Sequence, residues 1–465
     1  MGFSSIFFVF GFLPIFMLLY YLVPSRMRNV VLLIGSMFFY AWGEPIYLIL
    51  MLFSSIFHYI MGLEIESLRF NFRKTKLNLI FVIVVDIFIL GFFKYYGFLM
   101  DTIGGIFRIS ISYPELSLPI GLSFYTFKNL SYIFDIYKKE TPAEKNFLHF
   151  AVYTTMFPHM SAGPIVRYSD VSERLAKRKL NMYNFGVGAE YFIKGLAKKI
   201  ILADNLAAIY MDIFAATTPN SMLSSWIGIF AYTMQIYFDF SGYSDMAIGL
   251  GQMLGFRFKK NFDYPYISTS VSEFWRRWHM SLGSWFRDYI YIPLGGNRVS
   301  TRCQIRNILV VWALTGLWHG ASWNFVFWGV YYGILLLIEK FLLKKDFLEK
   351  KLPKWACNLY TMFAVMIGWV FFSQTNFSSM GKYLLSLIGI GTSGLIDVAA
   401  LHYLRSGFIL FIISIIACRP GLYKLCKHSM KHRPWLAIGF NIVLFVISVS
   451  YMVYNSYTPF LYIQF

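Results

Sequence analysis

The sequence predicts an all-α protein that crosses a membrane many times. Hydrophobic residues fill 57% of the 465 positions and charged residues only 14%, whereas soluble domains are about 25% charged. The mean hydropathy is +0.56. Apolar stretches such as Ser5 to Val23 and Leu77 to Leu99 have the length of about 20 residues that a helix needs to cross about 30 Å of hydrocarbon. Because these runs are long and continuous, they predict spanning helices rather than barrel strands.

The charge balance favours a membrane protein over a nucleic-acid binder. The 42 Lys and Arg residues outnumber the 23 Asp and Glu residues, which gives a net charge of +19. Basic residues collect in the cytoplasmic loops of membrane proteins, and this accounts for most of the excess. The remainder is available to bind a phosphate-bearing cytosolic donor. We expect no nucleic-acid partner, and the four cysteines show no spacing typical of a metal site or a disulfide framework.

Basic clusters predict how the chain threads the membrane. Arg26 and Arg28 follow the first span, which places the N-terminus outside. Residues 147–166 are apolar but carry prolines and glycines between two basic flanks, which favours a re-entrant segment. The expected spans include residues 77–99, 116–137, 183–216, 223–255, 355–373 and 400–417, with a last one from 434. A longer apolar stretch, 307–338, lies between the fourth and fifth of these. We therefore predict a single domain over residues 1–465 with about eleven membrane segments. A short C-terminal tail, at about 457–465, should lie outside.

The segment 273–298 is too polar to span and too aromatic for a solvated loop. Its apolar residues recur at helical spacing, and Glu273, Arg276 and Arg277 fall towards the other face. Such a segment lies at the cytoplasmic interface or dips into the protein. It is either a membrane-surface anchor or a wall of a donor site whose arginines hold phosphates.

The apolar run 308–338 is too long for one span and is interrupted at Gly316, His319 and Gly320. Non-helical backbone at membrane depth is tolerated where protein or a water-filled cavity covers it, which predicts a polar tunnel at His319. The histidine is either a hydrogen-bonding strut between helices or a base. Imidazole titrates near neutrality and can take a proton from a hydroxyl that attacks a thioester.

Two carboxylates, Asp239 and Asp245, interrupt the apolar segment 223–255. They lie too far apart along a helix to stack as neighbours, so they do not predict a two-carboxylate acid/base site. Each of them should orient a histidine, pair with an arginine or make a buried structural hydrogen bond.

Three motifs resemble those of the membrane-bound O-acyltransferases. They are Trp275 to Ser281 (WRRWHMS), Tyr289 to Arg298 (YIYIPLGGNR) and Gly316 to Gly320 (GLWHG). Supporting stretches are Pro119 to Phe127, Ala162 to Arg167 and Asp239 to Asp245. Within this family the chain is similar to the bacterial branch that acetylates cell-surface polysaccharides, and the D-alanyl transferase of teichoic acids is a more distant relative. The resemblance covers nearly the whole chain.

The resemblance implies a ring or funnel of helices around a central tunnel in the bacterial cytoplasmic membrane. The basic clusters place both termini outside. It implies that His319 is the catalytic histidine and that His279 is a second histidine nearer the cytosolic mouth. The implied donor-binding residues are Arg276, Arg277 and Trp278, and the implied tunnel and support residues are Asp239, Ser241, Tyr243, Asp245 and Asn324. We expect no metal and no tightly bound cofactor.

The same resemblance implies the substrates. The donor is acetyl-CoA or an acyl carrier thioester on the cytosolic side. The acceptor is a polysaccharide or a separate extracytoplasmic acetyltransferase of the SGNH-hydrolase type.

The end of the chain is similar to a C-terminal FxYxxF motif, which implies that Tyr462 carries the acyl group. The alternative is an aromatic residue of the membrane interface. Two departures from the family pattern are Lys128-Asn129, where members often carry a glutamine and a small residue, and His159 in place of a glutamine. Both departures should adjust the lining of the tunnel.

Two rival functions remain open on the sequence alone. A proton-coupled transporter or flippase would use His319 and the aspartates as a relay, and it predicts inverted repeats with matching broken helices. A membrane scaffold for a separate polysaccharide acetyltransferase predicts that His319→Ala leaves surface acetylation intact.

Overall fold

The computed structural model describes residues 1–114, 116–216, 219–343, 352–374, 376–421, 433–454 and 458–460. The chain over these ranges is helical and contains no strand, which confirms the all-α prediction. The described chain forms two compact units. The first comprises Met1–Phe192 and Ser244–Lys259, and the second comprises Ile193–Tyr243 and the described residues from Lys260 onward. The expectation of a single domain stays a prediction.

The first unit holds the N-terminal helices. They are α1 (Leu13–Leu22), α2 (Arg28–Ala41), α3 (Leu48–Ser67), α4 (Phe72–Leu90), α5 (Tyr96–Phe107), α6 (Leu122–Tyr137), α7 (Phe147–Thr155) and α8 (Tyr168–Ala176). Short helical turns lie at Phe7–Phe12, Ser25–Met27, Gly91–Tyr95 and Phe157–His159.

The second unit holds most of the later helices, while α9 (Met182–Ala197) and α11 (Met222–Met253) contribute residues to both units. The others are α10 (Asp204–Phe214), α12 (Val271–Arg277), α13 (Met280–Phe286), α14 (Thr301–His319), α15 (Trp323–Leu337), α17 (Lys354–Ser373), α18 (Phe377–Ser386), α19 (Val398–Ala417) and α21 (Pro434–Tyr454). Short helical turns lie at Lys198–Ala203, Pro265–Ile267, Arg287–Tyr291 and Ile338–Leu343.

Among the described residues, 6 helical segments have the length and composition to cross a membrane: Leu48–Ser67, Phe72–Phe107, Trp323–Leu343, Lys354–Ser373, Val398–Ala417 and Pro434–Tyr454. The shorter Phe7–Leu22 is also apolar. The chain is therefore a multi-pass membrane protein. The larger number of segments and the tunnel stay predictions. Part of the difference comes from length, because α6, expected to span, has only 16 residues.

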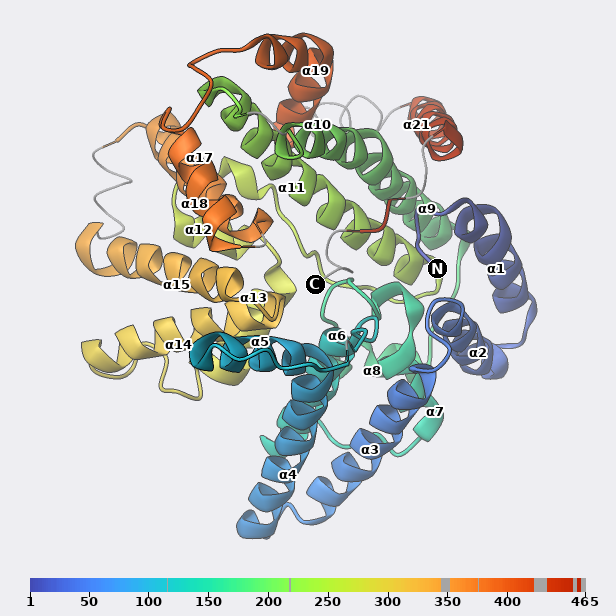
Figure 1. The fold of residues 1–465 in the computed structure, drawn as a ribbon. Helices are drawn as coiled ribbons and strands as arrows, with labels where there is room; N and C mark the ends of the chain where they lie inside the picture. The colour runs from blue at the N-terminus through green and yellow to red at the C-terminus, as the bar shows by residue number, and fades with distance from the viewer. Residues whose placement is uncertain are drawn as a thin grey trace. The chain divides into compact units, whose positions relative to one another are not determined.

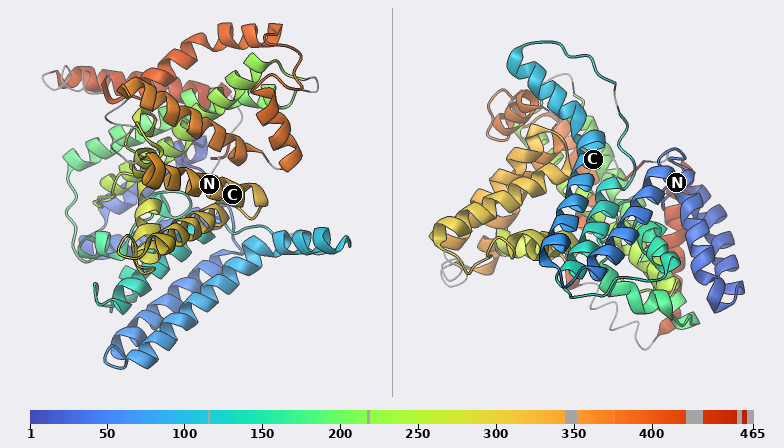
Figure 2. Two further views of the ribbon diagram at one scale, coloured as in Figure 1. Left: turned by 90° about the vertical axis from the view of Figure 1, so that its left-hand side faces the viewer. Right: turned by 90° about the horizontal axis from the view of Figure 1, so that it is seen from below.

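In the first unit, helix α3 packs closely against α4 and α6. Helices α3 and α4 run side by side (Figures 1 and 2), and His58 Nε2 of α3 lies 3.0 Å from Asp86 Oδ2 of α4. A Cβ atom at Gly62 would lie only 2.7 Å from the Tyr132 ring of α6. The glycine therefore lets α6 pack against α3.

A tight helical hairpin, α14 and α15, organises the second unit (Figure 1). A Cβ atom at Gly316 would lie 2.2 Å from the Phe325 carbonyl oxygen, and one at Gly329 would lie 2.2 Å from that of Trp312. The two backbones can approach this closely because both positions lack side chains. The hairpin turns directly after His319 and so fixes where that residue lies.

Candidate active site

The first predicted histidine, His279, occupies a break between two short helices. The Ser270 hydroxyl caps α12 by accepting from the Glu273 N–H at 3.0 Å. Helix α12 ends at Arg277 and α13 begins at Met280. Between them His279 has φ 42° and ψ 53°, in the left-handed region. The chain therefore turns at this residue, and the imidazole lies at the joint of the two helices.

The surroundings of His279 are largely aromatic. Its ring centroid lies 4.7 Å from that of Phe240, edge to face, and 6.5 Å from that of Phe262. Its Nδ1 lies 3.1 Å from the Asn261 side-chain oxygen. Burial lowers the pKa of His279 to about 3, because removing a cation from water disfavours the charged form. The imidazole is therefore neutral at physiological pH.

The second predicted histidine, His319, is the last residue of α14 and is 3% exposed. The Trp328 and Phe372 rings flank it, at centroid distances of 4.9 and 5.4 Å. Trp318 contacts both histidines, with centroids 5.0 Å from His319 and 5.9 Å from His279. The two histidines therefore contact the same tryptophan. The predicted interruption near Gly320 corresponds to the turn between α14 and α15.

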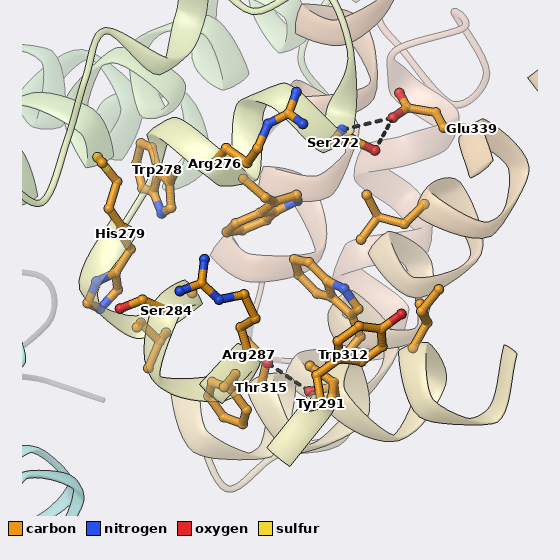
Figure 3. A pocket seen from close by; sticks show the side chains of 18 of the residues that line it. Ser272, Arg276, Trp278, His279, Ser284, Arg287, Tyr291, Trp312, Thr315 and Glu339 are labelled. Carbon is orange, nitrogen blue, oxygen red and sulfur yellow. Dashed lines mark hydrogen bonds between the residues drawn. The ribbon is translucent and has the colours of Figure 1, made fainter. Parts of the chain in front are cut away.

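A cavity of about 870 Å³ lies beside this joint, within the second unit (Figure 3). Its walls come from α12 to α15 and the turns that follow α13 and α15. The charged residues of its lining are Arg276, Arg287, Glu339 and Lys340, and Trp275, Trp278 and Trp312 supply aromatic surface. His279 belongs to this lining, while His319 does not. The cavity thus combines net positive charge, apolar walls and one of the two histidines.

The predicted donor-binding residues separate into two groups. Arg276 and Trp278 line the cavity. Arg277 is absent from the described lining and instead pairs with Glu273 at 2.9 Å and Asp263 at 3.3 Å. Its guanidinium therefore holds α12 to the preceding loop.

The predicted support residues are spread over the chain. Asp239 pairs with Lys199 at 2.6 Å, and Asp204 contacts the same lysine at 2.8 Å. Lys199 thus makes a buried hydrogen bond to Asp239, whereas the sequence left open a histidine, an arginine or a buried structural hydrogen bond. Asn324 donates to the Gln374 carbonyl at 2.8 Å and ties α15 to the end of α17.

Three further predicted support residues, Ser241, Tyr243 and Asp245, lie in α11. Ser241 and Tyr243 are buried in the second unit, and Tyr243 meets Phe460 edge-on with centroids 4.7 Å apart. Asp245 belongs to the first unit and is partly exposed. Tyr462 lies outside the described residues. Phe460, two positions before it, is buried, and the Lys199 ammonium lies 4.8 Å from its ring centroid.

The two departures from the family pattern meet in the first unit. Lys128 Nζ lies 3.1 Å from His159 Nδ1 and donates to the Thr154 carbonyl at 2.8 Å. Both side chains are fully buried. The unusual residues therefore form one hydrogen-bonded pair.

Sequence reasoning missed Asn261 and Glu339. Glu339 accepts from the Val271 N–H at 2.6 Å and from the Ser272 N–H at 2.8 Å, and so caps α12. Figure 3 shows the contact with Ser272. A carboxylate at the end of the apolar run 308–338 was a usable signal. Nothing in the sequence marks Asn261. Over the described residues, no group of three or more His, Cys, Asp or Glu residues could hold a metal ion.

Comparisons with known proteins identify the relatives of this chain. A profile of the membrane-bound O-acyltransferase family matches residues 138–380, which include both histidines. The chain is 42% identical to a probable alginate O-acetylase of Azotobacter vinelandii, over 90% of this chain and 84% of that protein. It is 38% identical to a probable alginate O-acetylase of Pseudomonas putida over the full length of both. It is 30% identical to the peptidoglycan O-acetyltransferase of Helicobacter pylori, over 100% of this chain and 97% of that protein.

Proposed function

The chain belongs to the membrane-bound O-acyltransferase family, and on this premise we propose that it moves an acetyl group from a cytosolic thioester to a hydroxyl on the far side of the membrane. The end product is an O-acetylated cell-surface polysaccharide, as the names of the relatives suggest. The observation that carries the proposal is the cationic cavity lined by His279, whose neighbour Trp318 also contacts His319.

The cavity suits acetyl-CoA as the donor. Phosphate groups are bound well by arginine, which can donate two parallel hydrogen bonds, and Arg276, Arg287 and Lys340 line the cavity. Its volume of about 870 Å³ lies in the range of small-molecule sites, roughly 300 to 1,000 Å³. In this proposal the cavity opens to the cytosol, and Trp278 covers the arm of the donor that carries the thioester.

The proposed chemistry needs one base and no metal. Nε2 or Nδ1 of neutral His319 takes the proton of the acceptor hydroxyl as its oxygen bonds to the thioester carbonyl carbon. The carbon–sulfur bond then breaks, the thiolate leaves, and the proton passes from the imidazolium to the sulfur. An ester and a free thiol result.

We take the Tyr462 hydroxyl as the first acceptor. Its acetyl ester would pass to a polysaccharide hydroxyl through an extracytoplasmic acetyltransferase of the SGNH-hydrolase type. The protein would lie in the cytoplasmic membrane of a bacterium with both termini outside. The transport and scaffold alternatives have no comparable support, because the relatives are named as enzymes that transfer acetyl groups.

The test is mass spectrometry of the purified full-length protein after incubation with isotope-labelled acetyl-CoA. We expect label on Tyr462 in the wild type, none there in Tyr462→Phe and none in His319→Ala. His402→Ala is the matched control, because His402 is an exposed histidine of α19, and it should label like the wild type.

Two outcomes contradict parts of the proposal. Label on Tyr462 in His319→Ala would remove the histidine from the reaction. A wild type that acetylates polysaccharide in membranes without any acetyl adduct would remove Tyr462 as the carrier.

A further inference from the structure

The loop before α12 runs along the joint that carries His279. The Asp263 N–H donates to the Arg277 carbonyl at 3.0 Å, and the Met280 N–H donates to the Asn261 carbonyl at 2.9 Å. These two backbone hydrogen bonds bracket His279 on both sides. The loop therefore holds the break between α12 and α13 in one conformation.

The side-chain oxygen of Asn261 accepts three hydrogen bonds at this joint. The donors are the Ser281 N–H at 3.2 Å, the Ser281 hydroxyl at 2.8 Å and His279 Nδ1 at 3.1 Å. The backbone N–H can only donate, so the amide atom that faces it is the oxygen. An amide oxygen only accepts, and therefore His279 Nδ1 carries a hydrogen.

This arrangement settles the tautomer of a neutral ring. A neutral imidazole has one N–H and one lone pair. With the hydrogen on Nδ1, the lone pair is on Nε2. His279 can then accept a hydrogen bond at Nε2, but it cannot donate one there to a thioester carbonyl or protonate a leaving thiolate.

We infer that Asn261 is a positioning residue that holds His279 in the Nδ1–H tautomer, so that Nε2 accepts a hydrogen bond from an N–H or O–H group of the donor. The inference rests on the proposed function for the identity of the donor. The pantetheine arm of a CoA thioester carries amide N–H groups that fit such an acceptor. His279 thus selects and orients the donor, and the transfer chemistry stays with His319.

Aromatic rings and charged side chains also lie near His279. Phe240, Phe262 and Trp318 contact its ring from other elements. The charged side chains that line the same cavity are Arg276, Arg287, Glu339 and Lys340. At Nδ1, the neutral amide of Asn261 lies 3.1 Å away and the Ser281 hydroxyl lies 3.5 Å away.

The first experiment compares the pH profiles of acetyl transfer for Asn261→Asp and Asn261→Leu. Aspartate keeps the three acceptor contacts but adds a negative charge, which favours the imidazolium form. We expect activity near the wild-type level at high pH, with the acid limb moved up by about one pH unit or more. Leucine keeps the size but accepts nothing, and we expect kcat/KM to fall about 100-fold.

The matched control is Asn71→Asp. Asn71 Oδ1 caps α4 by accepting from the Lys74 N–H at 3.2 Å, and aspartate caps a helix equally well. Its profile should follow the wild type. An unchanged pH profile in Asn261→Asp, or wild-type transfer in folded Asn261→Leu, would overturn the inference.

A second measurement reads the tautomer without any turnover. Nitrogen-15 NMR of the full-length protein with labelled histidine distinguishes the two ring nitrogens, and His279→Gln identifies the signal. We expect a single Nδ1–H tautomer in the wild type and a mixture in Asn261→Leu. An Nε2–H tautomer in the wild type would overturn the inference whatever the activity. A correct tautomer without any transfer from acetyl-CoA would instead count against the proposed function.

Discussion

Three buried histidines, one in the first unit and two in the second, differ in what faces their rings. In the first unit, His58 lies between a carboxylate and a carbonyl, with Nε2 3.0 Å from Asp86 and Nδ1 2.8 Å from the Ser54 oxygen. In the second unit, His279 and His319 lie among aromatic rings, and a neutral amide meets Nδ1 of His279. All three side chains are at most 3% exposed. Burial therefore does not distinguish these three histidines from one another, whereas the charge of their partners does.

The largest expected effect concerns His319, whose ring lies among aromatic side chains. His319→Ala should lower acetyl transfer by about 10² to 10⁴-fold, the usual contribution of a general base. The melting temperature should change little, because the α14–α15 contact depends on Gly316 and Gly329 rather than on the imidazole. Initial rates and thermal unfolding in detergent measure the two quantities. Activity within tenfold of the wild type would make His319 a packing residue.

The next largest effect concerns His58, whose ring faces the Asp86 side chain. Asp86→Asn removes the carboxylate that faces His58, and breaking a buried pair costs about 3 kcal/mol or more. We expect a lower melting temperature and an unchanged rate per folded molecule. A specific loss of rate at constant melting temperature would show that the His58 pair also takes part in the reaction.

A smaller effect depends on pH. The pKa of His279 is about 3 in the folded protein and about 6.5 in an unfolded chain. Below about pH 6.5 the unfolded state binds the extra proton, so stability is lost as the pH falls towards 3. Unfolding should therefore become easier between pH 7 and about 4.5, and His279→Gln should lose about 2 kcal/mol less over that interval. Equal losses in both proteins would mean that His279 is protonated in the folded state.

The smallest effect compares two neighbouring arginines. Arg276→Ala should raise the KM for acetyl-CoA about tenfold and leave the melting temperature unchanged, because this side chain lines the cavity. Arg277→Ala should lower the melting temperature, because Glu273 and Asp263 lose their partner. Titrations of the donor and thermal unfolding of each variant measure both quantities. A reversed pattern would assign phosphate binding to Arg277.

The sequence predicted the helical class and one break in the chain, but it did not predict the contacts around that break. The helical class follows from composition, and the glycines around His319 correctly marked a break in an apolar run. Asn261 could not be found because its contact with His279 forms only after the loop folds back over the joint. Arg277 and Arg276 are adjacent on one motif, and only the fold decides that one of them pairs with acids while the other lines the cavity.

The number of spans was harder to predict than the helical class. In the described part of the chain, six long apolar segments satisfy both length and hydropathy. Segments such as α6 and α11 carry buried polar side chains, among them Lys128 and Asp239. A hydropathy pattern does not tell whether such a segment is exposed to lipid or shielded by neighbouring helices.

The contact between Gly316 and Gly329 limits how this protein can be redesigned. One added methyl group at either position would lie 2.2 Å from a carbonyl oxygen of the facing helix. Helices α14 and α15 would have to move apart, and His319 at the end of α14 would be displaced. A displacement of about 1 Å can cost a reaction about 100-fold in rate. Libraries that aim at larger acyl groups should therefore vary the cavity walls and leave this glycine pair untouched.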